Sequence, residues 1–138
     1  MKNYTTTNIR NVVLLGHGSS GKTTLAEAML FLSKGIDRFG NINDGNTTCD
    51  YDPEEIRRKF SINTSIAPVL WKNHKLNILD TPGYFDFEGE VKCATRAAEI
   101  ALILLTAKNG IEVGTEKAWG YANERDISRA FFVTKPEE

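Results

Sequence analysis

The stretch that decides the fold spans residues 16–23 and reads Gly16-His17-Gly18-Ser19-Ser20-Gly21-Lys22-Thr23. It follows a short apolar run at 12–15 and precedes a segment at 24–32 whose apolar residues have helical spacing. In a strand–turn–helix context, the pattern G-x-x-x-x-G-K-[ST] binds phosphate, because its glycines let several backbone N–H groups point at one anion. The sequence therefore predicts a phosphate-binding loop. The alternative is a glycine-rich turn that only joins a strand to a helix.

Two side chains of this loop are suited to separate tasks. We expect Lys22 to reach the β- and γ-phosphates of a nucleotide, and Thr23 to offer its hydroxyl to Mg²⁺. The N-terminus of the following helix adds unpaired N–H donors and a partial positive charge. The predicted nucleotide contacts are therefore the whole loop and Thr24.

Composition and charge exclude several classes of protein. The 138 residues predict one domain, 1–138, with the apolar and charged fractions of a globular protein. A formal net charge of −1 argues against binding nucleic acid by bulk electrostatics, so no DNA partner is expected. Cys49 and Cys93 form no C-x-x-C motif, and no signal sequence or membrane-length apolar run is seen, so we expect a cytoplasmic protein without a membrane partner.

Strand and helix patterns alternate after the loop. Apolar runs at 12–15, 100–105 and 130–133 predict buried parallel strands, and 61–70 with 75–79 predict a hairpin in which Pro68 requires a sheet edge. Helices are predicted over 24–32, with Leu25, Met29 and Leu32 buried, over 89–99, and over 115–123, with Thr115 as its cap and Trp119 packed inward. This order predicts a three-layer α/β fold of the P-loop NTPase type, in which the mostly parallel sheet has one antiparallel edge strand. The strand at 12–15 should lie between the strand at 75–79 and the pair at 100–105 and 130–133.

The segment 36–59 lacks clean periodicity. A loop of this length inside a domain is usually functional or mobile. Its position after the phosphate loop suits a segment that orders over a bound γ-phosphate. An ordinary solvated linker with a short helix near 53–59 explains the sequence equally well.

The run Asp80-Thr81-Pro82-Gly83 follows an apolar strand directly. An aspartate at the C-terminal end of a strand lies where α/β sheets place ligand-binding groups, so we expect Asp80 to hold Mg²⁺, directly or through water. The Gly83 amide is expected to donate to a γ-phosphate. An ordinary strand-ending turn is the alternative, since Asp, Pro and Gly are common in turns.

With these motifs in place, the chain resembles the N-terminal part of the GTP-binding domain of translation elongation factor G, from about residue 8 to residue 135. The resemblance is carried by three stretches: 16–23, 80–83 followed by Asp86-Phe87, and 58–62. It implies a ribosome-associated GTPase that converts GTP and water to GDP and phosphate with Mg²⁺, through two switch loops. The resemblance also implies that the family's other domains, the last strand and helix of this domain, and the loop that buttresses guanine are absent from the chain. We therefore expect weak nucleotide binding by the isolated 138 residues.

Departures from the family pattern concern catalysis and base reading. Tyr84 stands where the family has the histidine that positions the attacking water, so we expect slow hydrolysis with Tyr84, Lys22 and Gly83 as the catalytic residues. Ser61 matches the family's magnesium-binding threonine, and Ser19 stands in place of an aspartate. The base-reading motif Asn-Lys-x-Asp matches, weakly, Thr134-Lys135-Pro136-Glu137.

Two other functions stay open at this point. One is a nucleotide-gated module that docks on ribosomes and hardly hydrolyses, which Tyr84 favours. The other is a P-loop ATPase or small-molecule kinase, which adenine binding would favour.

Overall fold

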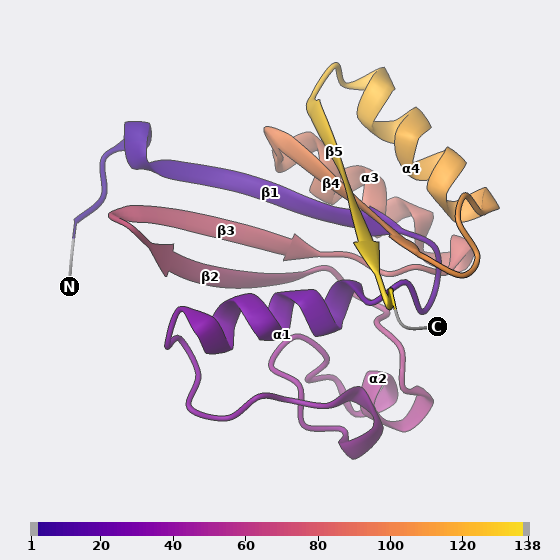
Figure 1. Cartoon of the computed structure of the whole chain (residues 1–138), viewed down its shortest axis with the longest axis horizontal. Helices are drawn as coiled ribbons and strands as arrows, with labels where there is room; N and C mark the ends of the chain where they lie inside the picture. The colour runs from indigo at the N-terminus through magenta and orange to yellow at the C-terminus, as the bar shows by residue number, and fades with distance from the viewer. Residues whose placement is uncertain (1–2, 137–138) are drawn as a thin grey trace.

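A central parallel strand organises the molecule. The computed structural model describes residues 3–136, in which β1 (Ile9–Gly16) lies at the middle of a five-stranded sheet of order β2-β3-β1-β4-β5 (Figure 1). The other strands are β2 (Ser65–Trp71), β3 (His74–Asp80), β4 (Ile100–Thr106) and β5 (Ser128–Thr134). Only β2 runs antiparallel to its neighbour, so the predicted fold class and strand order are confirmed.

Residues 3–136 form four α-helices and three short 3₁₀ turns. They are α1 (Lys22–Leu32), α2 (Pro53–Arg58), α3 (Glu88–Ala97) and α4 (Val113–Glu124), and the 3₁₀ turns are η1 (Thr6–Asn8), η2 (Ile42–Asp44) and η3 (Phe85–Phe87). Figure 1 shows α1 on one face of the sheet and α3 and α4 on the other. None of the helices formed by residues 3–136 is long and apolar enough to span a bilayer.

Alternation along β1 divides the core into two clusters. Val13 and Leu15 pack with the small residues of α3 and α4, whereas Leu14 packs with Ala26 and Leu30 of α1. A strand covered on both faces has no polar side, which explains the continuous apolar run at 12–15. The burial predicted for Val91, Ala94 and Ala98 is confirmed, but α3 ends at Ala97 rather than residue 99, so Ala98 is buried as its extended C-cap.

The predicted hairpin is present, but its first strand begins later than expected. β2 starts at Ser65 rather than residue 61, because the amides of Ile62 and Asn63 donate to a side chain, Glu55, instead of a neighbouring strand. Lys72 and Asn73 both have positive φ (42° and 65°), as a two-residue hairpin turn requires. Pro68 lies on β2, the edge strand, as predicted.

The predicted burial of α1 is wrong in one respect. Leu25 and Met29 are partly buried, but Leu32 is 71% exposed, and the most buried positions include Ala26, Glu27 and Leu30. The sheet covers the helix on one side, and the segment that follows the helix covers it on another. In that segment the Gly40 amide donates to the buried carboxylate of Glu27. The apolar spacing therefore did not identify the buried face.

Two expectations for α4 are also wrong. The helix begins at Val113 with Glu112 as its cap, and Thr115 closes the capping box from the third helical position. Trp119 is 44% exposed and stacks on Phe131 of β5, with ring centroids 5.7 Å apart. Small residues, Ala118 and Ala122, fill the contact with the sheet, leaving no room there for an indole.

The segment between α1 and β2 contains the short helix α2, as one of the two interpretations predicted. Asp52 caps α2, and Glu55 completes a capping box. Most of the segment lies below α1 (Figure 1), and its end reaches α3, where the Thr64 amide donates to Oε2 of Glu90 at 2.9 Å.

Candidate nucleotide-binding site

The loop after β1 has a backbone that depends on glycine. Gly16 and Gly21 have φ of 141° and 92°, and Ser19 also has a positive φ of 62°. A Cβ at Gly16 would lie 2.4 Å from the carbonyl oxygen of Leu104 on the neighbouring strand. Gly21 caps α1 without a side chain, so it leaves the amides of the first turn to the space enclosed by the loop.

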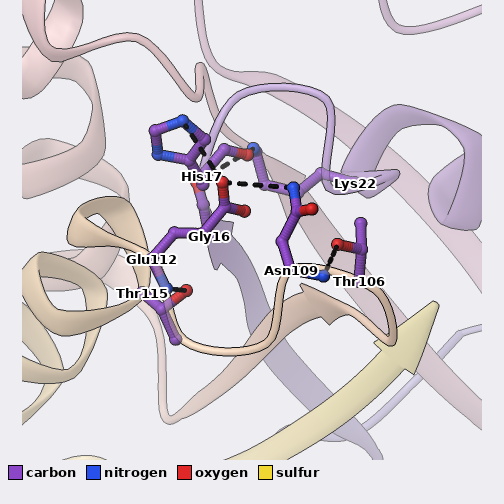
Figure 2. Close-up of polar contacts among 7 residues, drawn as sticks. All are labelled: Gly16, His17, Lys22, Thr106, Asn109, Glu112 and Thr115. Carbon is purple, nitrogen blue, oxygen red and sulfur yellow. Dashed lines mark hydrogen bonds and ion pairs between the residues drawn. The ribbon is translucent and has the colours of Figure 1, made fainter.

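Lys22 lies inside the curve of this loop. Its Nζ donates to the carbonyl oxygens of Gly16 (3.1 Å) and His17 (2.8 Å), and the residue is 6% exposed (Figure 2). Burial lowers the pKa of Lys22 to about 8, and attraction to Asp80 offsets only part of this effect. The ammonium is thus held, poorly solvated, where an anion would stabilise it.

A cleft of about 410 Å³ opens beside the loop. The first helical turn of α1, the end of β3 and the segment 39–61 contribute to its walls. The predicted site residues that line it are Gly18, Ser19, Gly21, Lys22, Thr23, Thr24, Ser61, Thr81, Gly83, Tyr84 and Lys135. The fold therefore gathers into one concavity residues that lie more than a hundred positions apart in the sequence.

Other predicted residues support this cleft without lining it. Ser20 is buried, and its carbonyl oxygen accepts a hydrogen bond from the Thr134 hydroxyl at 2.9 Å, which ties the end of β5 to the loop. Gly16, His17, Asp80 and Pro82 also lie outside the lining set. Glu137 lies outside the described residues.

Asp80 is the most deeply placed polar group of the site. It is 1% exposed, and neither carboxylate oxygen has a hydrogen-bond partner of good geometry among the described residues. Burial raises the pKa of Asp80 to about 7, and the nearby Thr23 hydroxyl and Lys22 ammonium offset only part of the shift. A buried carboxylate without a partner is costly unless a cation joins it.

Hydroxyl groups complete a cluster of oxygens near Asp80. The Oγ1 of Thr23 lies 3.2 Å from the Oγ of Ser61, which donates to Oδ1 of Asp50 at 2.7 Å. Burial raises the pKa of Asp50, and Ser61 opposes the shift. Hydroxyls, carboxylates and phosphate oxygens are the ligands that Mg²⁺ takes, so the residues fit this ion. Sequence reasoning missed Asp50, because a lone aspartate in a long loop carries no signal.

Within residues 3–136, no cluster of three or more His, Cys, Asp or Glu side chains could hold a metal. Mg²⁺ in proteins is usually held by one or two carboxylates together with substrate phosphates, which matches the hydroxyls and carboxylates near the cleft.

Gly83 permits a close approach between the end of β3 and the loop. A Cβ there would lie 2.6 Å from Nζ of Lys22 and 2.7 Å from Cα of Gly18. The next residue, Tyr84, is 45% exposed and packs on Phe60, with ring centroids 4.7 Å apart. Tyr84 therefore lies on the rim of the cleft.

The side chain of His17 turns away from the cleft. Its Nε2 lies 3.9 Å from Oε1 of Glu112, an oxygen that also accepts from Nδ2 of Asn109 at 3.3 Å (Figure 2). A Cβ at Gly114 would lie 2.7 Å from the His17 ring. His17 thus links the loop to the start of α4 through its contact with Glu112, a role that the motif alone did not predict.

A phosphate loop between a central parallel strand and a helix, with an aspartate ending the adjacent strand, defines a P-loop nucleotide-binding domain. The family model for the elongation factor Tu GTP-binding domain matches residues 7–137. The chain therefore belongs to this family, and the predicted resemblance to translational GTPases is confirmed.

Individual relatives agree. The chain is 40% identical over 127 residues to an elongation factor G-like protein of Mycobacterium tuberculosis, covering 92% of the chain but only 18% of that protein. It is 40% identical over 131 residues to the mitochondrial ribosome-releasing factor 2 of Yarrowia lipolytica, covering 95% of the chain and 16% of that protein. The chain thus spans less than a fifth of the length of these relatives.

Solved structures share the fold. A crystal structure of a protein from Thermus thermophilus superposes with a TM-score of 0.89 at 43% identity, over 91% of the chain and 19% of that protein. The translation elongation factor SelB of Methanococcus maripaludis, in complex with the GTP analogue GppNHp, superposes with a TM-score of 0.70 at 20% identity, over 93% of the chain and 22% of SelB.

Proposed function

We propose that this chain binds GTP and GDP with Mg²⁺ and hydrolyses GTP to GDP and phosphate, as the nucleotide-binding domain of an elongation-factor-G-like translation factor. The observation that carries the proposal is that Lys22 and Thr23 line a cleft bounded by the glycine-rich loop, with the buried Asp80 carboxylate near both of them. Family membership favours guanine nucleotides over adenine nucleotides.

In this proposal each group has a defined part. Lys22 exchanges its carbonyl partners for the β- and γ-phosphate oxygens, which restore the stabilisation that burial removes from its ammonium. Thr23, Ser61 and Asp80 would hold Mg²⁺, which would supply positive charge to neutralise the phosphate oxygens. The ion would also stabilise the ionised form of the buried Asp80 carboxylate.

Two segments would respond to the γ-phosphate. The segment 36–64 brings Ser61 to Thr23, and the segment beginning at Gly83 approaches Lys22 so closely that a Cβ at Gly83 would lie 2.6 Å from Nζ. Both line the cleft, so the presence or loss of one phosphoryl group changes the contacts of both. We propose that these segments are the two switches through which the nucleotide state is reported to a ribosome.

Hydrolysis should be slow without a partner. The Tyr84 hydroxyl can donate or accept a hydrogen bond but does not become cationic at neutral pH, so it lacks the electrostatic contribution of a histidine. The loss of such a contribution costs on the order of 10²–10³ in rate. A nucleotide-gated ribosome-binding module with little hydrolysis is therefore the second candidate, and Tyr84 is the observation that favours it.

Single-turnover kinetics of a full-length protein carrying this domain, with and without ribosomes, separate the two candidates. If the protein is a GTPase, ribosomes should stimulate its hydrolysis of GTP, and Tyr84→Phe should slow that hydrolysis. If it is a binding module, its association with ribosomes should depend on the bound nucleotide, and ribosomes should not stimulate hydrolysis.

Base preference is tested independently. We propose that Thr134, Lys135 and Glu137 contact guanine, since Lys135 lines the cleft. Nucleotide extracted from the purified full-length protein should be GDP, and excess ATP should not displace it. Co-purification of ADP, or displacement of GDP by equimolar ATP, would favour an ATPase or kinase instead.

A further inference from the structure

Glu55 is a buried carboxylate on a short surface helix. It is 1% exposed, although its neighbour Glu54 lies on the surface of the same helix. No ion pair within the described part of the chain includes Glu55, because both arginines of α2 pair with Glu54. An ionised group in this position must be held by hydrogen bonds.

Three backbone amides supply these bonds. Oε2 of Glu55 accepts from the amide of Asp52 at 3.1 Å, and Oε1 accepts from the amides of Ile62 (2.9 Å) and Asn63 (3.0 Å). One carboxylate therefore joins the chain before α2 to the chain after it. The first bond is an ordinary capping-box contact, but the other two reach well beyond the helix.

The second pair of bonds fixes the chain next to Ser61. Ile62 follows Ser61 directly, and on the other side the Lys59 amide donates to the carbonyl oxygen of Glu55 at 2.7 Å. Ser61 is thus held between two attachments to one residue. Its Oγ lies 3.2 Å from Oγ1 of Thr23 in this arrangement.

We propose that Glu55 is a positioning residue for the metal-facing hydroxyl of Ser61, acting through the backbone without touching nucleotide or metal. The inference rests on the proposed binding of a magnesium nucleotide in this cleft. It predicts that the loss of Glu55 weakens Mg²⁺ binding to the same extent as the loss of Ser61 itself.

The test is a double-mutant cycle on a full-length protein carrying the domain, with equilibrium binding of GppNHp measured across a Mg²⁺ titration. Ser61→Ala and Glu55→Ala should each raise the Mg²⁺ midpoint roughly 10-fold, the scale seen when a residue that supports a metal ligand is removed. The double variant should show no larger shift than Ser61→Ala, because Glu55 acts only through that hydroxyl.

Glu54→Ala is the matched control, since it removes an exposed carboxylate from the adjacent position of the same helix and should leave the midpoint unchanged. Glu55→Gln keeps an acceptor for Ile62 and Asn63 and should restore most of the wild-type Mg²⁺ dependence. If Glu55→Ala does not fold, Glu55→Asp keeps the charge but cannot span both attachments, and it should shift the midpoint in the same direction.

Two results overturn the inference. One is an unshifted midpoint in folded Glu55→Ala or Glu55→Asp, and the other is a shift of unchanged size in the Ser61→Ala background, as a general structural role would produce. Either result counts against the role of Glu55 when the wild-type protein binds GppNHp with Mg²⁺. A wild-type protein that binds no magnesium nucleotide overturns the proposed function as well.

Discussion

The loop at 16–23 and the segment at 36–64 both line the cleft, but they are held in place by different means. The first loop is built between β1 and α1, and its shape depends on its own backbone, including the positive φ of Gly16 and Gly21. The second segment takes its shape from two buried carboxylates, Glu55 and Glu27, the latter accepting from the amides of Gly40 (3.2 Å) and Thr48. The comparison teaches that the shape of the first loop depends on glycine backbone conformations, whereas the second segment depends on buried carboxylates that accept from its backbone amides.

The largest effect should follow from removing the ammonium of the first loop. Lys22→Ala in a full-length protein should weaken GDP binding about 100-fold or more, since a charge-assisted contact to phosphate contributes roughly 3 kcal/mol. Isothermal titration with GDP and Mg²⁺ measures this loss. Lys108→Ala, at an exposed lysine outside the cleft, is the control. Unchanged GDP affinity in Lys22→Ala would show that the loop is not the phosphate site.

A smaller loss of GDP affinity is expected at Gly83, where the segment after β3 approaches the loop after β1. Gly83→Ala would place a methyl 2.7 Å from the Cα of Gly18, so the loop and the end of β3 must separate. We expect GDP affinity to fall roughly 10-fold, the equivalent of about 1.4 kcal/mol, which lies within the usual range of overpacking strain. Gly89→Ala is the matched control, because a Cβ there meets nothing within 4 Å. Equal affinities of the two variants would contradict the close approach.

A substitution in the second segment, 36–64, should change its local sensitivity to protease rather than the stability of the whole domain. Gly40→Ala would place a methyl 2.6 Å from Oε2 of Glu27 and 2.7 Å from Cα of Thr47, so this part of the segment should detach while the sheet persists. Limited proteolysis should cut within 36–48 several-fold faster, with little change in the melting temperature. Gly120→Ala, where a Cβ meets nothing within 4 Å, should match the wild type. A cooperative loss of the whole fold would show that the two regions are not separable.

The smallest effect concerns the stability of the protein without nucleotide. The pKa of Asp80 is raised to about 7 from 3.8, so burial disfavours the ionised form of this carboxyl in the folded protein. The resulting loss of folding stability is complete above about pH 7, shrinks as the pH falls, and is absent below the pKa of the unfolded state. Asp80→Asn should therefore raise the melting temperature by a few degrees at pH 8, about 1 kcal/mol, and by less at pH 5. Thermal unfolding of both proteins at the two pH values measures this, and a lower melting temperature of the variant at pH 8 would contradict it.

Predictions from sequence succeeded where the pattern and its physical cause are local. The run at 12–15 and the edge position of Pro68 follow from burial on two faces and from a missing N–H donor, so both were predictable. The exposure of Leu32 and Trp119 and the place of Thr115 within its helix were not predictable, because packing partners distant in the sequence decide which side of a helix is covered. The predicted nucleotide, metal and base contacts stay predictions.

The sequence by itself determined the order of strands and helices and the glycine-dependent loop, because hydrophobic period and positive φ are properties of neighbouring residues. Only the tertiary structure decided that Ser61 lies between Thr23 and Asp50, and that Glu27 and Glu55 are buried acceptors of backbone amides. The physical reason is that no local sequence pattern distinguishes a charged helix residue that becomes buried from one that stays in solvent, or marks a polar loop residue that contacts a distant element. The burial of such a carboxylate is tolerated only when the fold brings amide donors to it.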